Sequence, residues 1–386
     1  MKYEKNIKLS KLDEKDFKNL LSNRNNFINS GDNSFVPASS PIEKLANQIT
    51  IVQENFYIKS KEVRDENTII TLSPKNNRNI PIHRPGEYLV LSTYIAGNYY
   101  SRPYYIINSK NQGESEYTIS VLKKEKGLVS EYLRNIKESK EVTINGLYGN
   151  AYYNSVRDYD NIIAICTNYG INAVYSLAKR ILSSGLKITL NIIYSVKKYS
   201  EIAFRQELQE MSNQSSRINL EIVISDEVVD GYKTGYASEK IISKYLTDNT
   251  SILIYGEEGL LKYLNKELEG FKLPRRLITY EDYLPRCNIR NPKKYQLLIK
   301  YNGKEYKHSC YNNVTLLDSI EDSQLIIRSQ SRTGKDCCCN VKLLAGKVKI
   351  VNDNRNNSEK QLNMIDPANT YPNSNTLIEI SWYLFF

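Results

Sequence analysis

The chain has 386 residues and a formal net charge of +10, with 40% hydrophobic and 25% charged residues. This balance excludes intrinsic disorder and leaves room for two or three domains. The basic residues are scattered and form no basic stripe interleaved with aromatic residues, so no nucleic acid is expected as a partner.

The N-terminal part of the chain predicts an arm followed by a β domain. Residues 1–46 are polar and charged, and we expect a helix near residues 13–23. In residues 47–155, short runs rich in β-branched and aromatic residues alternate with polar turns. The runs are ITIVQENFYI, NTIITLS, EYLVLSTYI, YYIINS, YTISVLKK and EVTING. Strands of this length, separated by turn signals, predict a small antiparallel β-barrel.

Residues 156–285 change to an alternation of apolar strands and helical patterns. The strands NIIAIC, KITLNIIYSV, INLEIVIS and SILIYG are each followed by a segment with helical spacing. Four such alternations predict a parallel sheet covered by helices, with right-handed crossovers. Ligands of such sheets bind at the carboxyl ends of the strands.

A polar linker separates the α/β pattern from a third unit, residues 294–386. The hairpin-like YQLLIKYNGKEYKHSC opens this unit, the helix-like NVTLLDSI follows, and LIEISWYLF closes it. The pattern predicts a small α+β domain.

Two segments of the barrel region suit a flavin dinucleotide. Arg102, Pro103, Tyr104 and Tyr105 follow Ser101 at the expected start of a strand. A guanidinium group suits the pyrophosphate, and a tyrosine ring suits the isoalloxazine. Further on, the segment from Gly127 to Ser130 opens a short helix. Small residues there let backbone N–H groups approach a phosphate.

These motifs resemble those of the ferredoxin–NAD(P) reductase superfamily. Arg102 to Tyr105 is similar to the family's Arg-x-Tyr-Ser/Thr, Pro85 to Tyr88 to its Pro-Gly-Gln-Tyr, and Gly127 to Ser130 to its Gly-x-x-Ser turn. The resemblance extends over residues 35–380, in the domain order of hybrid reductases that carry a plant-type ferredoxin domain at the C-terminus. It implies an FAD-binding barrel, an NAD(P)-binding α/β domain and a β-grasp ferredoxin-like domain.

The nicotinamide side departs from the family pattern. The family's flavin-contacting Ser or Thr is Tyr105 here. Of its glycine-rich dinucleotide loop, Gly170 and Ile171 remain, whereas Thr167 and Asn168 stand where glycines let the backbone approach a pyrophosphate. The later Cys-Gly-Pro corresponds to Tyr255, Gly256 and Glu257. FAD binding is therefore expected to persist, with a weakened NAD(P)H site.

The third unit resembles a ferredoxin domain that has lost most of its cluster ligands. The four ligand positions fall on Ser331, Asp336, Cys339 and Ala368, so only one thiolate remains. Such clusters are held by thiolates, and alanine cannot ligate iron. A [2Fe–2S] cluster is therefore not expected. The run Cys337–Cys339 could act as a redox-sensitive patch, or join Cys310 in a rearranged site.

The resemblance implies a flavin-dependent oxidoreductase that moves electrons between NAD(P)H, or a redox partner protein, and an acceptor protein through FAD. The alternative is a pseudoenzyme, a reductase-like interaction or regulatory subunit without NAD(P) and cluster chemistry. The acceptor, the choice of NADH or NADPH and the oligomeric state are not predicted.

The location expected from the sequence is the cytoplasm. The charged N-terminus lacks the apolar core of a signal peptide. The sequence has no run of about 18 apolar residues, so no membrane-spanning helix is expected. The six cysteines form no disulfide framework and are expected to be reduced thiols. Two histidines exclude a multi-histidine metal site.

Overall fold

The chain divides into two units, residues 1–50 and 51–386. The structure, a computed structural model, describes residues 54–76, 80–108, 115–123, 127–184, 186–283, 289, 291–325, 327, 329, 332, 340–353 and 355–380. In the first unit it describes Asn19, Ser22 and Asn26, which are helical, two of them within the helix expected near residues 13–23. Within these residues, no helix combines the length and the apolar character needed to cross a membrane.

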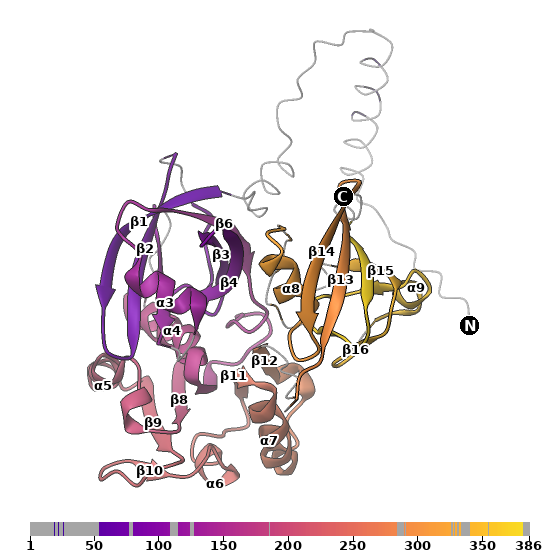
Figure 1. Ribbon diagram of the computed structural model, residues 1–386. Coiled ribbons are helices and arrows are strands. Elements are labelled where there is room, and N and C mark those ends of the chain that lie inside the picture. Colours follow the sequence, from indigo (N-terminus) through magenta and orange to yellow (C-terminus); the bar gives the residue numbers. More distant parts are fainter. Residues whose placement is uncertain are drawn as a thin grey trace. The chain divides into compact units, whose positions relative to one another are not determined.

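The first part of the second unit is an antiparallel barrel (Figure 1). The order of its described strands in the sheet is β4-β3-β6-β1-β2-β5. A bridge between Ile106 and Ile119 connects the two edges of this sheet and closes the barrel. The elements are β1 (Glu54–Val63), β2 (Asn67–Pro74), β3 (Tyr88–Ile95), β4 (Asn98–Tyr105), β5 (Tyr117–Leu122), α3 (Leu128–Asn135) and β6 (Glu141–Tyr148).

Strand β4 begins earlier than the sequence analysis expected. Ala96 and Gly97 both have positive φ, 51° and 87°, and form a two-residue turn that pairs Ile95 with Asn98. Such turns match the twist of the flanking strands and make tight hairpins. The motif from Arg102 to Tyr105 therefore lies in the second half of β4, not at the start of a strand.

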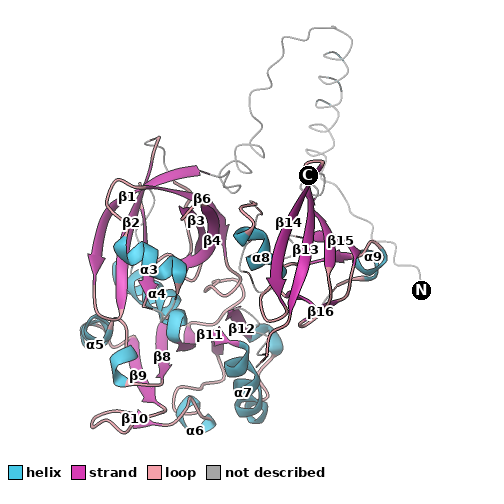
Figure 2. Cartoon of the chain, in the orientation of Figure 1, coloured by secondary structure: helices cyan, strands magenta, loops and turns pink. Residues whose placement is uncertain are grey.

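The α/β part has a parallel sheet with the strand order β10-β9-β8-β7-β11-β12 among the described residues. Figure 2 shows its alternation of strands and helices. The chain starts in the middle at β7, proceeds to β8 and β9, and then returns to β11 beside β7. This reversal creates a switch point at the carboxyl ends of β7 and β11, where doubly wound folds bind ligands. The elements are β7 (Asn161–Thr167), η1 (Asn168–Gly170), α4 (Ile171–Ser184), β8 (Thr189–Val196), η2 (Tyr199–Glu201), α5 (Arg205–Gln214), β9 (Ile218–Ile224), β10 (Lys233–Thr234), α6 (Glu239–Ile242), β11 (Thr250–Glu257), α7 (Glu258–Leu268), η3 (Glu269–Phe271), η4 (Arg275–Leu277) and β12 (Ile278–Tyr283).

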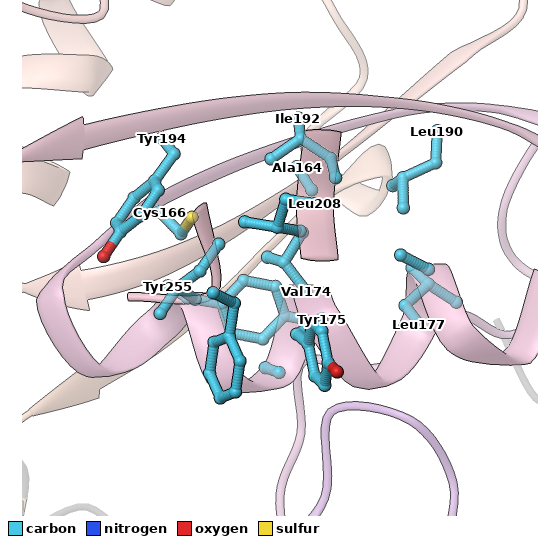
Figure 3. Packing of buried hydrophobic residues seen from close by; sticks show 14 of the residues in the cluster. Ala164, Cys166, Val174, Tyr175, Leu177, Leu190, Ile192, Tyr194, Leu208 and Tyr255 are labelled. Atoms are coloured by element: carbon cyan, nitrogen blue, oxygen red, sulfur yellow. The ribbon is translucent and has the colours of Figure 1, made fainter. Parts of the chain in front are cut away.

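Both faces of this sheet are buried. Along β7, Ile162, Ala164 and Cys166 join one hydrophobic cluster, while Ile163 and Ile165 join another on the opposite face. This alternation follows from the two-residue period of a strand covered on both sides. Figure 3 shows side chains of α4 packed against those of β7 and β8.

A chain of asparagine amides connects the amino-terminal parts of three neighbouring strands. Asn191 of β8 donates to Asn161 of β7 (2.9 Å), and Asn219 of β9 donates to Asn191 (2.8 Å). Asn161 also donates to the Thr250 hydroxyl at the start of β11 (2.8 Å). Asn191 is 2% exposed, so its amide needs these partners. We refer to Asn161, Asn191 and Asn219 as the amide ladder.

The third part has the strand order β14-β13-β19-β15-β17, with β13 and β19 parallel and the other pairs antiparallel. Helix α8 packs on this sheet through Leu316, Leu317 and Ile320, as in a β-grasp fold. The elements are β13 (Lys294–Tyr301), β14 (Lys304–Tyr311), α8 (Leu316–Asp322), β15 (Val341–Ala345), β16 (Val348–Ile350), α9 (Asn357–Gln361), β17 (Met364–Ile365), β18 (Thr370–Pro372) and β19 (Thr376–Ile380).

Candidate functional site

The motif on β4 presents its side chains in two directions. Arg102 and Tyr104 lie two residues apart and so share one face of the strand. Both are half-buried, as is Pro103 between them. Burial raises the pKa of the Tyr104 phenol above its ordinary value, which already leaves it neutral at physiological pH. A guanidinium and a neutral aromatic ring on one face fit the phosphate and the ring of a flavin nucleotide.

Tyr105 lies on the opposite face of β4 and is buried among other tyrosines. Its ring meets that of Tyr88 edge-on, with 5.9 Å between centroids, and that of Tyr255 edge-on at 6.2 Å. Tyr148 packs on Tyr88 at 6.1 Å. We call Tyr88, Tyr105, Tyr148 and Tyr255 the tyrosine cluster. The two residues that the sequence analysis placed on the nicotinamide side therefore touch each other.

Tyr255 anchors the end of β11 to the exit of the barrel. Its hydroxyl donates to the Ala151 carbonyl (2.7 Å), and the residue is 1% exposed. Burial, followed by the nearby Glu281 carboxylate, raises the pKa of this phenol. Glu281 of β12 accepts from the backbone N–H groups of Asn150 (2.8 Å) and Ala151 (3.2 Å). The sequence analysis missed Glu281, since nothing in its local pattern marks it.

Gly170 and Gly256 allow close packing at the switch point. A Cβ atom on Gly170 would lie 2.5 Å from the backbone oxygen of Tyr255. A Cβ atom on Gly256 would lie 2.7 Å from the Thr167 hydroxyl. Ile171 begins α4 and is fully buried. The remnants of the dinucleotide loop thus join β7 to β11 through direct contact.

The Gly127–Ser130 segment opens α3 as the sequence analysis expected. Gly127 precedes the helix in an extended conformation, and its carbonyl accepts the N–H of Glu131 (2.9 Å). The Ser130 hydroxyl donates to the same carbonyl (3.0 Å). In this arrangement the Ser130 side chain bonds within its own turn.

Arg102 forms ion pairs with two carboxylates from the third part of the chain. Its Nη1 donates to the Glu321 carboxylate of α8 (2.9 Å), and its Nη2 lies 3.6 Å from Asp318. Arg332 also donates to Glu321 (2.6 Å) and forms a short ion pair with Asp318. In the sequence Arg332 directly follows the cluster position Ser331, and the structure places it beside Arg102, the candidate phosphate arginine.

Ala368, at the fourth cluster position, is 1% exposed within the core of the third part. Its backbone N–H donates to the Asp366 carboxylate (2.8 Å). Cys310 is 2% exposed, and burial raises the pKa of its thiol to about 11. Ser331, Asp336 and Cys337–Cys339 lie outside the described residues. Within the described part of the chain, no group of three or more His, Cys, Asp or Glu side chains could hold a metal ion.

Two protein families match adjacent parts of the chain. Residues 58–153 match the oxidoreductase FAD-binding domain, and residues 164–266 match the oxidoreductase NAD-binding domain. Together these matches cover about half of the chain, in the order barrel and then α/β sheet. The chain belongs to the ferredoxin–NAD(P) reductase superfamily.

Two curated relatives are similar to parts of the chain. The gamma subunit of sulfhydrogenase 2 from Pyrococcus furiosus is 25% identical over 178 residues, covering 42% of this chain and 62% of the relative. A flavohemoprotein from Oceanobacillus iheyensis is 21% identical over 59% of this chain and 58% of its own. The chain thus spans about three fifths of the length of these curated relatives.

A solved structure is similar to a larger share of the chain. Phthalate dioxygenase reductase, described as a modular structure for electron transfer from pyridine nucleotides to [2Fe–2S], aligns with a TM-score of 0.65 and 15% identity. The alignment covers 85% of this chain and 98% of the phthalate dioxygenase reductase chain. The fold class predicted from the sequence is confirmed, and the superfamily is one of flavin-dependent oxidoreductases. The comparisons give no support to the pseudoenzyme alternative.

Proposed function

We propose that this chain is a flavin-dependent electron-transfer protein that binds FAD on the barrel. Arg102 would hold the pyrophosphate, Tyr104 would lie against the isoalloxazine, and the turn from Gly127 to Ser130 would approach a phosphate. The observation that carries the proposal is the position of Arg102 and Tyr104 on one face of β4, inside the segment that matches an FAD-binding domain. FAD when bound supplies the redox chemistry, and the chain supplies its binding and orientation.

Titration with FAD tests this proposal. FAD fluorescence quenching should give a dissociation constant for the wild type, and Arg102→Ala should weaken binding about tenfold or more because a charge-assisted contact is lost. Arg276→Ala is the matched control, since Arg276 is an exposed arginine in η4 of the α/β part. No FAD binding by the wild type, or equal affinity in both arginine variants, would contradict the proposal.

The electron donor is proposed to be NAD(P)H acting slowly, or a redox partner protein. Slow reduction is supported by the contact between Tyr105 and Tyr255. Their two phenol rings fill the space between the barrel and the end of β11, on the side where the family pattern places the nicotinamide. Tyr105→Ser shortens the side chain to the type found in the family and should speed anaerobic bleaching of the flavin by NADH or NADPH.

Tyr99→Ser serves as the control for this experiment. Tyr99 lies on the same strand and is equally buried, but its ring meets Tyr94 (4.9 Å) rather than Tyr255. Wild-type bleaching at a rate typical of enzymes, about 10 per second, would refute slow reduction. A partner protein that reduces the flavin faster than either nucleotide would identify the second donor.

A further inference from the structure

The Glu321 carboxylate lies in a set of donors that would equally suit a phosphate. Its Oε2 accepts from Arg102 Nη1 (2.9 Å), and its Oε1 accepts from Arg332 Nη1 (2.6 Å) and from the backbone N–H of Ser101 (3.3 Å). The Ser101 carbonyl accepts from both guanidinium groups, at 2.7 and 3.0 Å. Glu321 is 2% exposed. Two arginines and a backbone amide form an anion site around the buried Glu321 carboxylate at the middle of β4.

The occupant of this anion site comes from one face of α8. Asp318, Glu321 and Asp322 are three and four residues apart, so they share a face of the helix. Asp318 contacts both arginines, and Asp322 accepts from the Tyr100 hydroxyl (3.1 Å). The Thr315 hydroxyl caps the N-terminus of the helix by accepting the Asp318 N–H (3.0 Å). This hydrogen bond holds the first turn, which carries Asp318, in helical form.

The charges of the site are balanced within the chain. Burial raises the pKa of Asp318, but the guanidinium groups of Arg332 and Arg102 outweigh this effect, so the pKa lies below its ordinary value. Two carboxyl groups, those of Asp318 and Glu321, face the two guanidinium groups. A phosphate that bound Arg102 at the same time would add uncompensated negative charge beside Glu321, in a poorly solvated place.

We propose that the acidic face of α8 is an internal competitor for Arg102, so that flavin phosphates and the third domain bind to β4 in competition. This inference rests on the proposed function, in which Arg102 holds the FAD pyrophosphate. Because coupling between two binding events is reciprocal, docking of α8 lowers the affinity for FAD, and FAD loosens the contact between α8 and β4. The ligand class that competes is a flavin carrying phosphate, and riboflavin does not compete because it carries none.

The test compares FAD and riboflavin affinities in the full chain. The double variant Glu321→Gln/Asp318→Asn removes both competing charges and keeps side chains of similar size. It should bind FAD about tenfold more tightly than the wild type, equivalent to about 1.4 kcal/mol, with the riboflavin affinity unchanged. Asp322→Asn is the matched control, since it removes one charge from the same helix face without touching Arg102, and it should leave both affinities unchanged.

A second measurement uses the wild type alone, because neutralising Glu321 beside buried Arg332 could unfold the third domain. Hydrogen exchange of the α8 amides should become faster when FAD is added and stay unchanged with riboflavin. Equal FAD affinities in the wild type and the double variant, or α8 exchange that FAD leaves unchanged or slows, would overturn the competition and leave the proposed function standing. Absence of FAD binding in the wild type and in every variant would overturn both.

Discussion

Substituting alanine for Gly170 tests whether this glycine serves sheet packing or ligand approach. An added Cβ would lie 2.5 Å from the backbone oxygen of Tyr255 and 2.6 Å from its Cβ. Neither atom can be moved away by rotating a side chain, so β11 or the η1 turn must shift. Overpacking of this kind costs about 1–3 kcal/mol. We expect Gly170→Ala to lower the free energy of unfolding by about 2 kcal/mol, with or without FAD and NADH.

The measurement is urea unfolding followed by far-UV circular dichroism. Gly259→Ala is the control, because an added Cβ at this exposed position of α7 has no neighbour within 4 Å. Alanine there should leave stability unchanged or raise it by up to about 1 kcal/mol through reduced chain entropy. A loss under about 0.5 kcal/mol in Gly170→Ala, combined with loss of nucleotide binding, would refute packing and assign Gly170 to a ligand.

Three further predictions concern the end of β11, the contact between β4 and α8, and the cluster positions. Tyr255→Phe should lower the free energy of unfolding by about 1–2 kcal/mol, because the buried Ala151 carbonyl loses its donor, and unchanged urea unfolding would contradict this. The depressed pKa of Asp318 means that its carboxylate stabilises the fold above its unfolded value of 3.8, and that this contribution is lost as the pH falls through the lower folded value. The stability difference between the wild type and Asp318→Asn should therefore shrink below pH 3.8, whereas a difference constant from neutral to strongly acid pH would oppose this linkage. Iron and acid-labile sulfide should stay far below cluster stoichiometry after anaerobic reconstitution, and a full [2Fe–2S] complement with an axial paramagnetic signal on reduction would show that the loss of ligands was misjudged.

The fold was predictable because its signals are local. Alternating runs marked the barrel strands, and the repeated strand–helix pattern marked the parallel sheet, as the family matches confirm. The start of β4 was missed because the turn at Ala96 and Gly97 was not recognised. Helical spacing was also expected after the strand INLEIVIS, but α6 comprises only Glu239–Ile242, since tertiary packing overrides a helical pattern at this length.

The residues of the site were predictable only in part, because their partners are distant in sequence. Arg102 was singled out by its motif, but Glu321 stands 219 positions away and carries no motif of its own. Tyr105 and Tyr255 were identified separately as bulky replacements, and only the fold shows that they meet. Glu281 was missed for the same reason as Glu321. Assignment of Arg102, Tyr104, Gly127 and Ser130 to FAD stays a prediction.

Because of the amide ladder, the α/β sheet is expected to tolerate substitutions less well at the amino-terminal ends of its strands than at their carboxyl ends. A one-residue slip between β7 and β8 or between β8 and β9 would break the hydrogen bonds of the amide ladder and reverse the faces of apolar residues. Strand order and alignment are thus secured at the amino-terminal ends, far from the loops that follow Thr167 and Tyr255. Loop positions without such packing, as at Asn168, can change to larger residues while the sheet keeps its alignment, whereas Gly170 and Gly256 are held by close contacts. A lineage could in this way lose a nucleotide loop gradually and still inherit an intact domain.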